Sequence, residues 1–175
     1  MIANPVFTEP LPSTMSREAF VARFGGVYEH SPWVAERVFD VGLSPGDDGP
    51  ADLSTRMRGI VEAAGEAAWL TLLRAHPELA GKLAVAGDLT KESASEQSSA
   101  GLDKCTEAEF RRFHELNATY RDRFGFPFII AVRGLKRQEI LSAFERRVHH
   151  MREAEIRTAL DQVHTIARLR LDAMC

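Results

Sequence analysis

The chain has 175 residues, of which 45% are hydrophobic and 27% charged, and its formal net charge is −3 at pH 7. This length is sufficient for one domain with a sizeable hydrophobic core, and the balance of residue types is that of a globular protein. The weak negative charge argues against a nucleic-acid partner, because phosphate backbones are bound by clustered Lys and Arg side chains.

The chain shows no feature of a secreted or membrane protein. Its start, MIANPVFTEPLPSTM, has no basic residues followed by an apolar run, so we do not expect a signal peptide. No apolar stretch approaches the about 20 residues of a spanning helix, so we expect no membrane partner. Cys105 and Cys175 are far apart and outside any C-x-x-C pair, which argues against a disulfide framework or a zinc site. A reducing, cytoplasmic setting fits these features.

The first third of the chain shows helical signals after an irregular start. Residues 1–15 are rich in proline and predict an irregular N-terminal arm, whereas residues 16–175 predict the folded helical domain. Ser16 is a suitable N-cap for the first helix. For the second helix, Ser31 is a suitable N-cap and Pro32 a suitable first residue, because proline has no N–H to leave unpaired there.

Further helices are expected on both sides of a His-Pro pair. The stretch LSPGDDGP predicts a loop, because Pro, Gly and Asp crowd together in it. Apolar residues then recur at helical spacing up to Ala75, with an interruption at Gly65. A residue before proline is biased away from the α region. His76 is therefore expected between helices, with Pro77 starting the next short helix.

The second half of the chain combines helices with one irregular apolar segment. Thr106 and Glu109 predict a capping box at the start of a long helix. Residues 126–132 break the helical rhythm, since Gly125 and Pro127 disfavour a helix and the β-branched residues favour an extended chain. Two more helices are expected from Lys136 onward. The predicted fold class is all-α: a single-domain irregular helical bundle with one extended apolar segment.

Three polar side chains in the stretch ESASEQSSAGL are candidates for binding a small polar ring. Ser93, Glu96 and Gln97 stand at positions i, i+3 and i+4, which share one face of a helix. A hydroxyl, a carboxylate and an amide on one face can pair with the N–H and C=O groups of a small heterocycle. The same spacing also fits a capping box in which Ser93 caps the helix, and that alternative needs no substrate.

His76 is the candidate for acid–base chemistry. If Pro77 begins a helix, the positive end of that helix would lower the pKa of a nearby histidine and attract an anion. A neutral imidazole beside an anion site suits proton transfer. The alternative is a histidine that caps or packs at a turn, because a single histidine is not a specific signal.

The extended segment poses a question of hydrogen bonding. Residues 126–132 are too apolar for a surface loop, yet the sequence offers no neighbouring strand to pair with their main chain. A ligand with alternating donors and acceptors, such as a ureide or imidazole ring, would satisfy these groups. Packing against helix ends is an equally good alternative.

Signals for other kinds of site are weak. The stretch HELNA starts like a zincin motif but lacks its second histidine. Glu145, His149 and Glu153 could align on a helix as metal ligands, although His149 near a helix C-terminus is the simpler interpretation. The sequence holds no dinucleotide, P-loop or serine-hydrolase motif. A helical adapter without activity and a metal-dependent lyase or hydrolase remain as alternative function classes.

Three strings taken together resemble one enzyme family: EHSPWVAE, RAHPELAGKLA with SASEQSSAGLD, and LNATYRDRFGFPFIIAVRG. The chain resembles the 2-oxo-4-hydroxy-4-carboxy-5-ureidoimidazoline (OHCU) decarboxylases from about Ser16 to about Leu171. The resemblance implies an all-α enzyme of urate breakdown, often a homodimer, which needs neither a metal nor an organic cofactor. It also implies a small ureidoimidazoline substrate, which loses CO2 to leave (S)-allantoin.

The resemblance also implies which residues act. The catalytic histidine of the family's His-Pro motif matches His76, which precedes Pro77, and its Ser-x-x-Glu-Gln substrate grip matches Ser93, Glu96 and Gln97. The family's apolar segment, which contacts the ring through its main chain, matches Phe128, Ile129, Ile130, Ala131 and Val132. Arg133 could reach an anionic group of the substrate.

Overall fold

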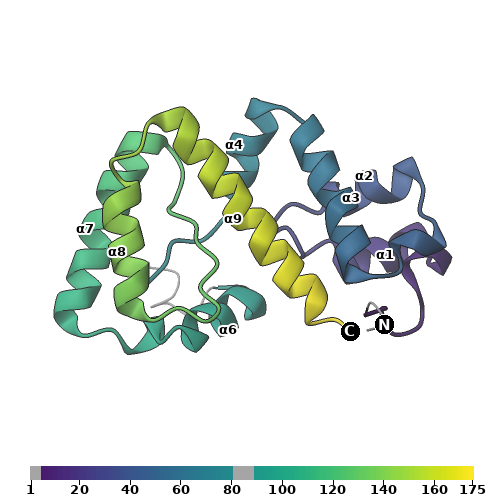
Figure 1. Ribbon diagram of the computed structural model, residues 1–175, viewed down its shortest axis with the longest axis horizontal. Helices are drawn as coiled ribbons and strands as arrows, with labels where there is room; N and C mark the ends of the chain where they lie inside the picture. Colours follow the sequence, from purple (N-terminus) through teal and green to yellow (C-terminus); the bar gives the residue numbers. More distant parts are fainter. Residues whose placement is uncertain (1–4, 81–88) are drawn as a thin grey trace. The chain divides into compact units, whose positions relative to one another are not determined.

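The computed structural model describes residues 5–80 and 89–175 (Figure 1). Within these ranges the chain forms α-helices and short 3₁₀ helices and no β-strand, so the predicted all-α class is confirmed. No helix in the described part is both long and apolar enough to cross a membrane. The chain divides into two compact units: unit 1 is Met1–Ala75 with His164–Cys175, and unit 2 is His76–Val163.

Unit 1 is built from η1 (Pro12–Thr14), α1 (Arg17–Phe24), α2 (Trp33–Val41), η2 (Pro45–Asp47), α3 (Pro50–Ala63), α4 (Glu66–Arg74) and the last part of α9 (Arg152–Asp172). Helix α1 begins as predicted, with the Ser16 hydroxyl accepting the N–H of Ala19 at 3.3 Å. Helix α2 begins at Trp33, one residue later than predicted. Pro32 has helical angles (φ −60°, ψ −21°), so the difference is one of boundary.

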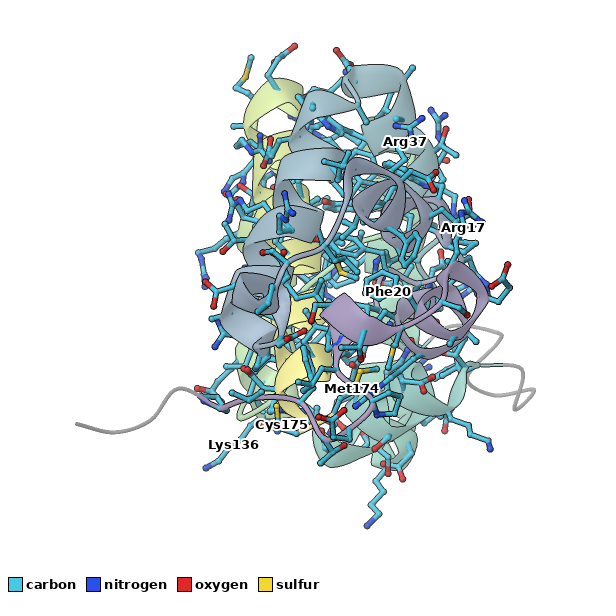
Figure 2. The ribbon with its side chains drawn as sticks, turned by 90° about the vertical axis from the view of Figure 1, so that its right-hand side faces the viewer. Arg17, Phe20, Arg37, Lys136, Met174 and Cys175 are labelled. Atoms are coloured by element: carbon cyan, nitrogen blue, oxygen red, sulfur yellow. The ribbon has the colours of Figure 1, made fainter. Side chains whose placement is uncertain are left out.

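The core of unit 1 is aromatic and aliphatic. Phe20 of α1 is fully buried, and its ring centroid lies 4.9 Å from that of Phe24. In the view of Figure 2, Phe20 lies nearer the middle, and Arg17 and Arg37 lie nearer the right-hand margin. Phe7 precedes α1 and packs on the same cluster, 5.2 Å from the Phe24 ring. Each such buried side chain contributes about 1.5–3 kcal/mol through removal of apolar surface from water.

Unit 2 is built from α6 (Lys91–Ser99), η3 (Leu102–Lys104), α7 (Glu107–Phe124), α8 (Arg137–Arg147) and the first part of α9. The predicted capping box is confirmed, because the Thr106 hydroxyl accepts the Glu109 N–H and the Glu109 carboxylate accepts the Thr106 N–H. Gly125 ends α7 in the left-handed region (φ +78°), where a glycine carries no steric penalty. The chain then leaves the helix and enters the apolar segment.

Candidate functional site

His76 lies at a bend in the chain. Only 9% of its surface is exposed. The predicted helix start at Pro77 is wrong: residues 77–80 are not helical and end in a turn, where Ala80 takes a φ of +48°. The remainder of the helix that we expected there falls on residues 81–88, outside the described part of the chain. Without a helix starting at Pro77, the expected effect of a helix N-terminus on the pKa of His76 loses its basis.

Side chains from two helices hold residues 76–80, which we call the His76 turn. The Gln97 side chain on α6 accepts the Ala80 N–H at 3.0 Å and donates to the Glu78 carbonyl at 3.2 Å. Asn117 on α7 donates to the Leu79 carbonyl at 3.0 Å. These bonds explain why the residues after Pro77 do not form a helix, since their main-chain groups are already paired outside a helical pattern.

Ser93, Glu96 and Gln97 all lie within α6, at the spacing that places them on one face of the helix. Ser93 and Gln97 are 4% and 5% exposed, and Glu96 is half-buried. Thr90 is the N-cap, and its hydroxyl accepts the Ser93 N–H at 3.2 Å. The alternative in which Ser93 caps the helix is therefore wrong, because Ser93 is the third residue inside it. The buried side of α6 carries Ser93 and Gln97 into the interior of unit 2.

Helix α7 supports both irregular segments of the candidate site. Asn117 reaches the His76 turn, and Arg121 forms an ion pair with Glu78 in that turn. Tyr120, on the same face, packs its ring edge against Phe128, with centroids 5.5 Å apart and planes at 84°. Residues three and four apart share a helix face. One face of α7 therefore contacts the His76 turn and the apolar segment.

The apolar segment runs without helix or strand assignment over residues 126–132, as predicted. Its largest apolar side chains are buried, with Phe128 1%, Ile129 3% and Val132 5% exposed. Ile130 and Ala131 are half-buried. Arg133, which we expected to reach an anionic group, is exposed at the end of the segment.

Side chains of α8 and α9 pair with the main chain of this segment. Nη1 of Arg147 donates to the Ile129 carbonyl at 2.8 Å, and Oε1 of Gln162 accepts the Ala131 N–H at 2.9 Å. From the sequence we expected a ligand or helix ends as partners, and these two side chains were missed. A signal for Arg147 was present, because it follows the buried Phe144 by three residues and so shares its helix face.

A buried cluster of polar groups surrounds Arg147. The carboxylate of Glu155, which is 0% exposed, accepts from Nε and Nη2 of Arg147 at 2.9 and 2.6 Å and from the Tyr120 hydroxyl. Nδ1 of His150 lies 2.7 Å from the second carboxylate oxygen. Burial, together with the nearby Glu155 charge, raises the pKa of Tyr120 well above its ordinary value, so its hydroxyl remains a donor.

The residues weighed as metal ligands do not form a site. Glu145 pairs with Arg112 at 2.9 Å, and both His149 and Glu153 are exposed. Across residues 5–80 and 89–175, no group of three His, Cys, Asp or Glu side chains is arranged to hold a metal ion. The metal-dependent alternative therefore has no candidate ligand set in the described part of the chain.

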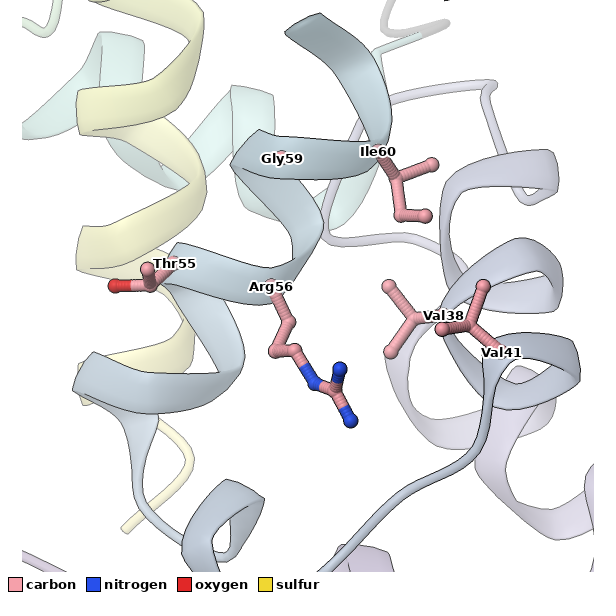
Figure 3. A pocket seen from close by; sticks show the side chains of 6 residues that line it. All are labelled: Val38, Val41, Thr55, Arg56, Gly59 and Ile60. Carbon is pink, nitrogen blue, oxygen red and sulfur yellow. The ribbon is translucent and has the colours of Figure 1, made fainter. Parts of the chain in front are cut away.

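Unit 1 carries a hollow of about 300 Å³ lined by Val38, Val41, Thr55, Arg56, Gly59 and Ile60. Figure 3 shows the apolar side chains of Val38, Val41 and Ile60 turned toward one another across it. The Arg56 guanidinium on its rim bonds to the Asp47 carboxylate at 2.9 Å. None of the predicted site residues lines this hollow.

Comparisons with known proteins point to one family. The family model of OHCU decarboxylase matches residues 13–172. A 2-oxo-4-hydroxy-4-carboxy-5-ureidoimidazoline decarboxylase of Haloferax volcanii is 46% identical over 154 residues, which are 88% of each chain. A second one, of Halalkalicoccus jeotgali, is 44% identical over 90% of this chain and 86% of its own.

A solved structure is similar as well. The crystal structure of an (S)-allantoin synthase has a TM-score of 0.72 and 33% identity, covering 93% of this chain and 52% of its own. This chain thus spans about half of that solved chain. Because the family model matches most of the sequence and the relatives are this similar, the chain belongs to the OHCU decarboxylase family.

Proposed function

We propose that this protein decarboxylates 2-oxo-4-hydroxy-4-carboxy-5-ureidoimidazoline to (S)-allantoin and CO2 in urate breakdown, without a metal or an organic cofactor. Membership of the family supports the reaction. The observation that carries the assignment to these residues is the His76 turn, in which a buried imidazole is followed by residues that Gln97 and Asn117 hold through hydrogen bonds.

For this reaction the protein mainly has to orient the substrate and transfer protons. The substrate carbon that carries the carboxylate also carries a hydroxyl and adjoins a C=N bond. When its bond to the carboxylate breaks, CO2 leaves and the electron pair passes toward the C=N group. The hydroxyl proton then leaves as a carbonyl forms, and the ring nitrogen that received the electron pair takes up a proton in exchange. A second proton, supplied by solvent, is added to the ureido-bearing carbon. Adding that proton on one face gives a single enantiomer.

His76 is the proposed group for the hydroxyl proton. A histidine can exchange protons near neutral pH, and such transfer contributes about 10²–10⁴-fold to a rate. The hydrogen-bonded turn orders the main chain directly after the imidazole before the substrate arrives, and pre-orientation of this kind lowers the entropic part of the barrier. Pro77 adds to this order, because its ring fixes the φ angle directly after His76.

The remaining residues are proposed to hold the ring. Ser93 and Glu96 on α6 would bind ring and ureido nitrogens, and Gln97 would add one contact while it holds the turn. Gln97 has an N–H and an oxygen lone pair beyond the two bonds that it makes to the turn. The main chain of residues 128–132 would bind the opposite edge of the ring, with Arg133 near an anionic group.

The test is a turnover assay with substrate made fresh from urate by urate oxidase and hydroxyisourate hydrolase. The circular dichroism of allantoin is followed with and without the protein. We expect wild-type protein to speed the formation of (S)-allantoin, and His76→Ala to lower kcat by about 10²–10⁴-fold.

Two controls accompany the His76→Ala measurement. Ser95→Ala changes an exposed residue of α6 and should keep the wild-type rate. The melting temperature of His76→Ala separates lost catalysis from lost folding. A folded His76→Ala variant with wild-type turnover would remove His76 from the mechanism, and a wild-type protein without any effect on the reaction would contradict the proposed function.

We further propose that the protein acts in the cytoplasm as a homodimer. Both cysteines are unpaired, which suits a reducing compartment. Dimer formation follows from the family resemblance, and light scattering of the purified protein would measure the mass of the assembly. A mass of one chain, 19.5 kDa, at assay concentrations would contradict the homodimer.

A further inference from the structure

The apolar segment is bonded to the protein at alternate residues. Its main chain is held at the Ile129 carbonyl by Arg147 of α8 and at the Ala131 N–H by Gln162 of α9. Within the part of the chain that the structure describes, the main chain of Ile130 makes no hydrogen bond. The residue between the two attachment points thus keeps both of its polar main-chain groups available.

The extended conformation that the sequence predicts for residues 126–132 explains why this alternation matters. In an extended chain the N–H and C=O of one residue point to one side, and those of the next residue point to the other side. The Ile129 carbonyl and the Ala131 N–H face the helices that bond to them. In the extended conformation that the sequence predicts, the groups of Ile130 face the opposite direction, where a ligand with one donor and one acceptor could pair with both.

The side chain of Phe128, which precedes Ile129, is also held in place. The Phe128 ring stacks on Phe144 of α8, with centroids 3.9 Å apart and planes at 10°. The Arg147 guanidinium carbon lies 4.5 Å from the centroid of the same ring. Because Phe144 and Arg147 are three residues apart on α8, one helix face holds both the side chain of Phe128 and the carbonyl of Ile129.

Stability alone does not account for a buried charge at this place. Arg147 is 6% exposed and Glu155 is 0% exposed. Burying an ion pair costs desolvation energy that its Coulomb attraction often fails to recover, and well-packed apolar residues would stabilise a core at least as well. What the pair supplies is a rigid, forked donor whose third N–H is directed at a single carbonyl.

We infer that Arg147 and Gln162 are positioning residues, which hold residues 129 and 131 so that the main chain of Ile130 meets the substrate ring. Neither side chain is required to touch the substrate. Glu155 orients Arg147 in this arrangement. The inference rests on the proposed function, and it specifies which side chains hold residues 128–132 in position to bind the substrate ring.

The test uses two variants, each of which removes one hydrogen bond between a side chain and the main chain of the apolar segment. Arg147→Lys keeps a positive charge beside Glu155 but loses the fork that reaches the Ile129 carbonyl. Gln162→Met keeps the length of the side chain and removes the acceptor for the Ala131 N–H. The matched control is Arg56→Lys, since Arg56 likewise bridges a carboxylate, that of Asp47, and a main-chain carbonyl, that of Gly42, within unit 1.

The readouts are KM and kcat from the allantoin assay and hydrogen exchange of peptides covering residues 126–135. Removing an interaction that the substrate makes equally in the ground state and in the transition state raises KM and leaves kcat unchanged. We expect KM to rise about tenfold in Arg147→Lys and about threefold in Gln162→Met, the scale of one hydrogen bond. Exchange in the peptides should become faster in both variants, while Arg56→Lys should keep the wild-type KM.

The possible outcomes separate the two proposals. If the wild-type protein does not turn over the substrate, the proposed function fails and this inference fails with it. If the wild-type protein is active and KM stays within twofold of its value in both variants, the positioning role is refuted and the function stands. An equal rise of KM in Arg56→Lys would also refute it, since the effect would then be general. Should Arg147→Lys fail to fold, Gln162→Met decides alone.

Discussion

Two arginines make the same set of bonds in very different surroundings. In unit 1, Arg56 bonds to the Asp47 carboxylate and to the Gly42 carbonyl. In unit 2, Arg147 bonds to the Glu155 carboxylate and to the Ile129 carbonyl. The side chains of the first pair are 39% and 7% exposed, and those of the second are 8% and 0% exposed.

The difference in burial changes what each arginine does. Water and salt screen the Arg56 side chain, so losing the Asp47 carboxylate leaves a charge that water can solvate. Water cannot replace a lost partner of the Arg147–Glu155 pair, because both side chains are buried. An unpaired charge in the interior strongly lowers the free energy of unfolding. The same bonds therefore close a surface loop in unit 1 and hold a candidate binding segment in unit 2.

The largest effect is expected from breaking the buried pair. Glu155→Gln leaves Arg147 without its countercharge and should lower the free energy of unfolding by about 3–5 kcal/mol. The matched change Asp47→Asn should cost less, about 1 kcal/mol, because the Arg56 charge left behind is half-exposed and the amide oxygen can still accept a hydrogen bond from Ser44. Urea unfolding followed by circular dichroism measures both. Equal losses in the two variants would mean that burial does not separate the two arginines.

A smaller effect is expected at the tyrosine that bonds to Glu155. Tyr120→Phe removes a hydrogen bond to a charged group and should cost about 1.5–3 kcal/mol. Tyr28 is the matched control in unit 1, where its hydroxyl bonds to Nδ1 of His164 at 2.7 Å. Tyr28→Phe should cost about 0.5–1.5 kcal/mol, because its partner is not a buried carboxylate. Thermal melts of both variants would show the order, and a larger loss in Tyr28→Phe would contradict it.

The smallest effect is expected from protonation of Asp47. Burial, the largest influence, raises the pKa of this carboxyl, but hydrogen bonds from Ser44 and Arg56 together outweigh it and hold the pKa below its ordinary value. A lowered pKa in the folded state means that this carboxylate adds stability above the unfolded pKa of about 3.9 and loses it as the pH falls through the folded value.

The measurement for Asp47 is the melting temperature from pH 7 to pH 3. The wild-type protein should melt above Asp47→Asn at pH 7, and the gap between them should narrow below about pH 4. A gap that stays constant over this range would show that the loop does not depend on the charge of Asp47.

Local signals in the sequence predicted much of the fold. The caps at Ser16 and Thr106 mark the starts of α1 and α7 because side-chain capping is decided within one turn of helix. The break in helical rhythm over residues 126–132 is likewise local, since it follows from residue types. The grouping of Ser93 and Gln97 on a buried face of α6 follows from helical spacing alone.

Signals that depend on distant partners were misjudged or missed. Pro77 has the local character of a helix start, yet hydrogen bonds from Gln97 and Asn117 hold the following residues in a turn. The spacing of Ser93 and Glu96 fits a capping box, but Thr90 occupies the cap. The Ser93 alternative was decided locally, by a cap three positions before it. The turn after Pro77 was decided by Gln97 and Asn117, which lie 17 and 38 positions from the residues they bond to.

The sequence by itself determined the all-α class, most of the helix starts, the family and the residue types of the candidate site. These properties depend on periodicity, capping and motif order, which involve neighbours along the chain. The tertiary structure alone decided how the non-helical main chain is paired. Arg147, which bonds to the Ile129 carbonyl, lies 18 positions farther along the chain. Gln162, which bonds to the Ala131 N–H, lies 31 positions farther along. Bonds of that range depend on helix packing, which no local pattern encodes.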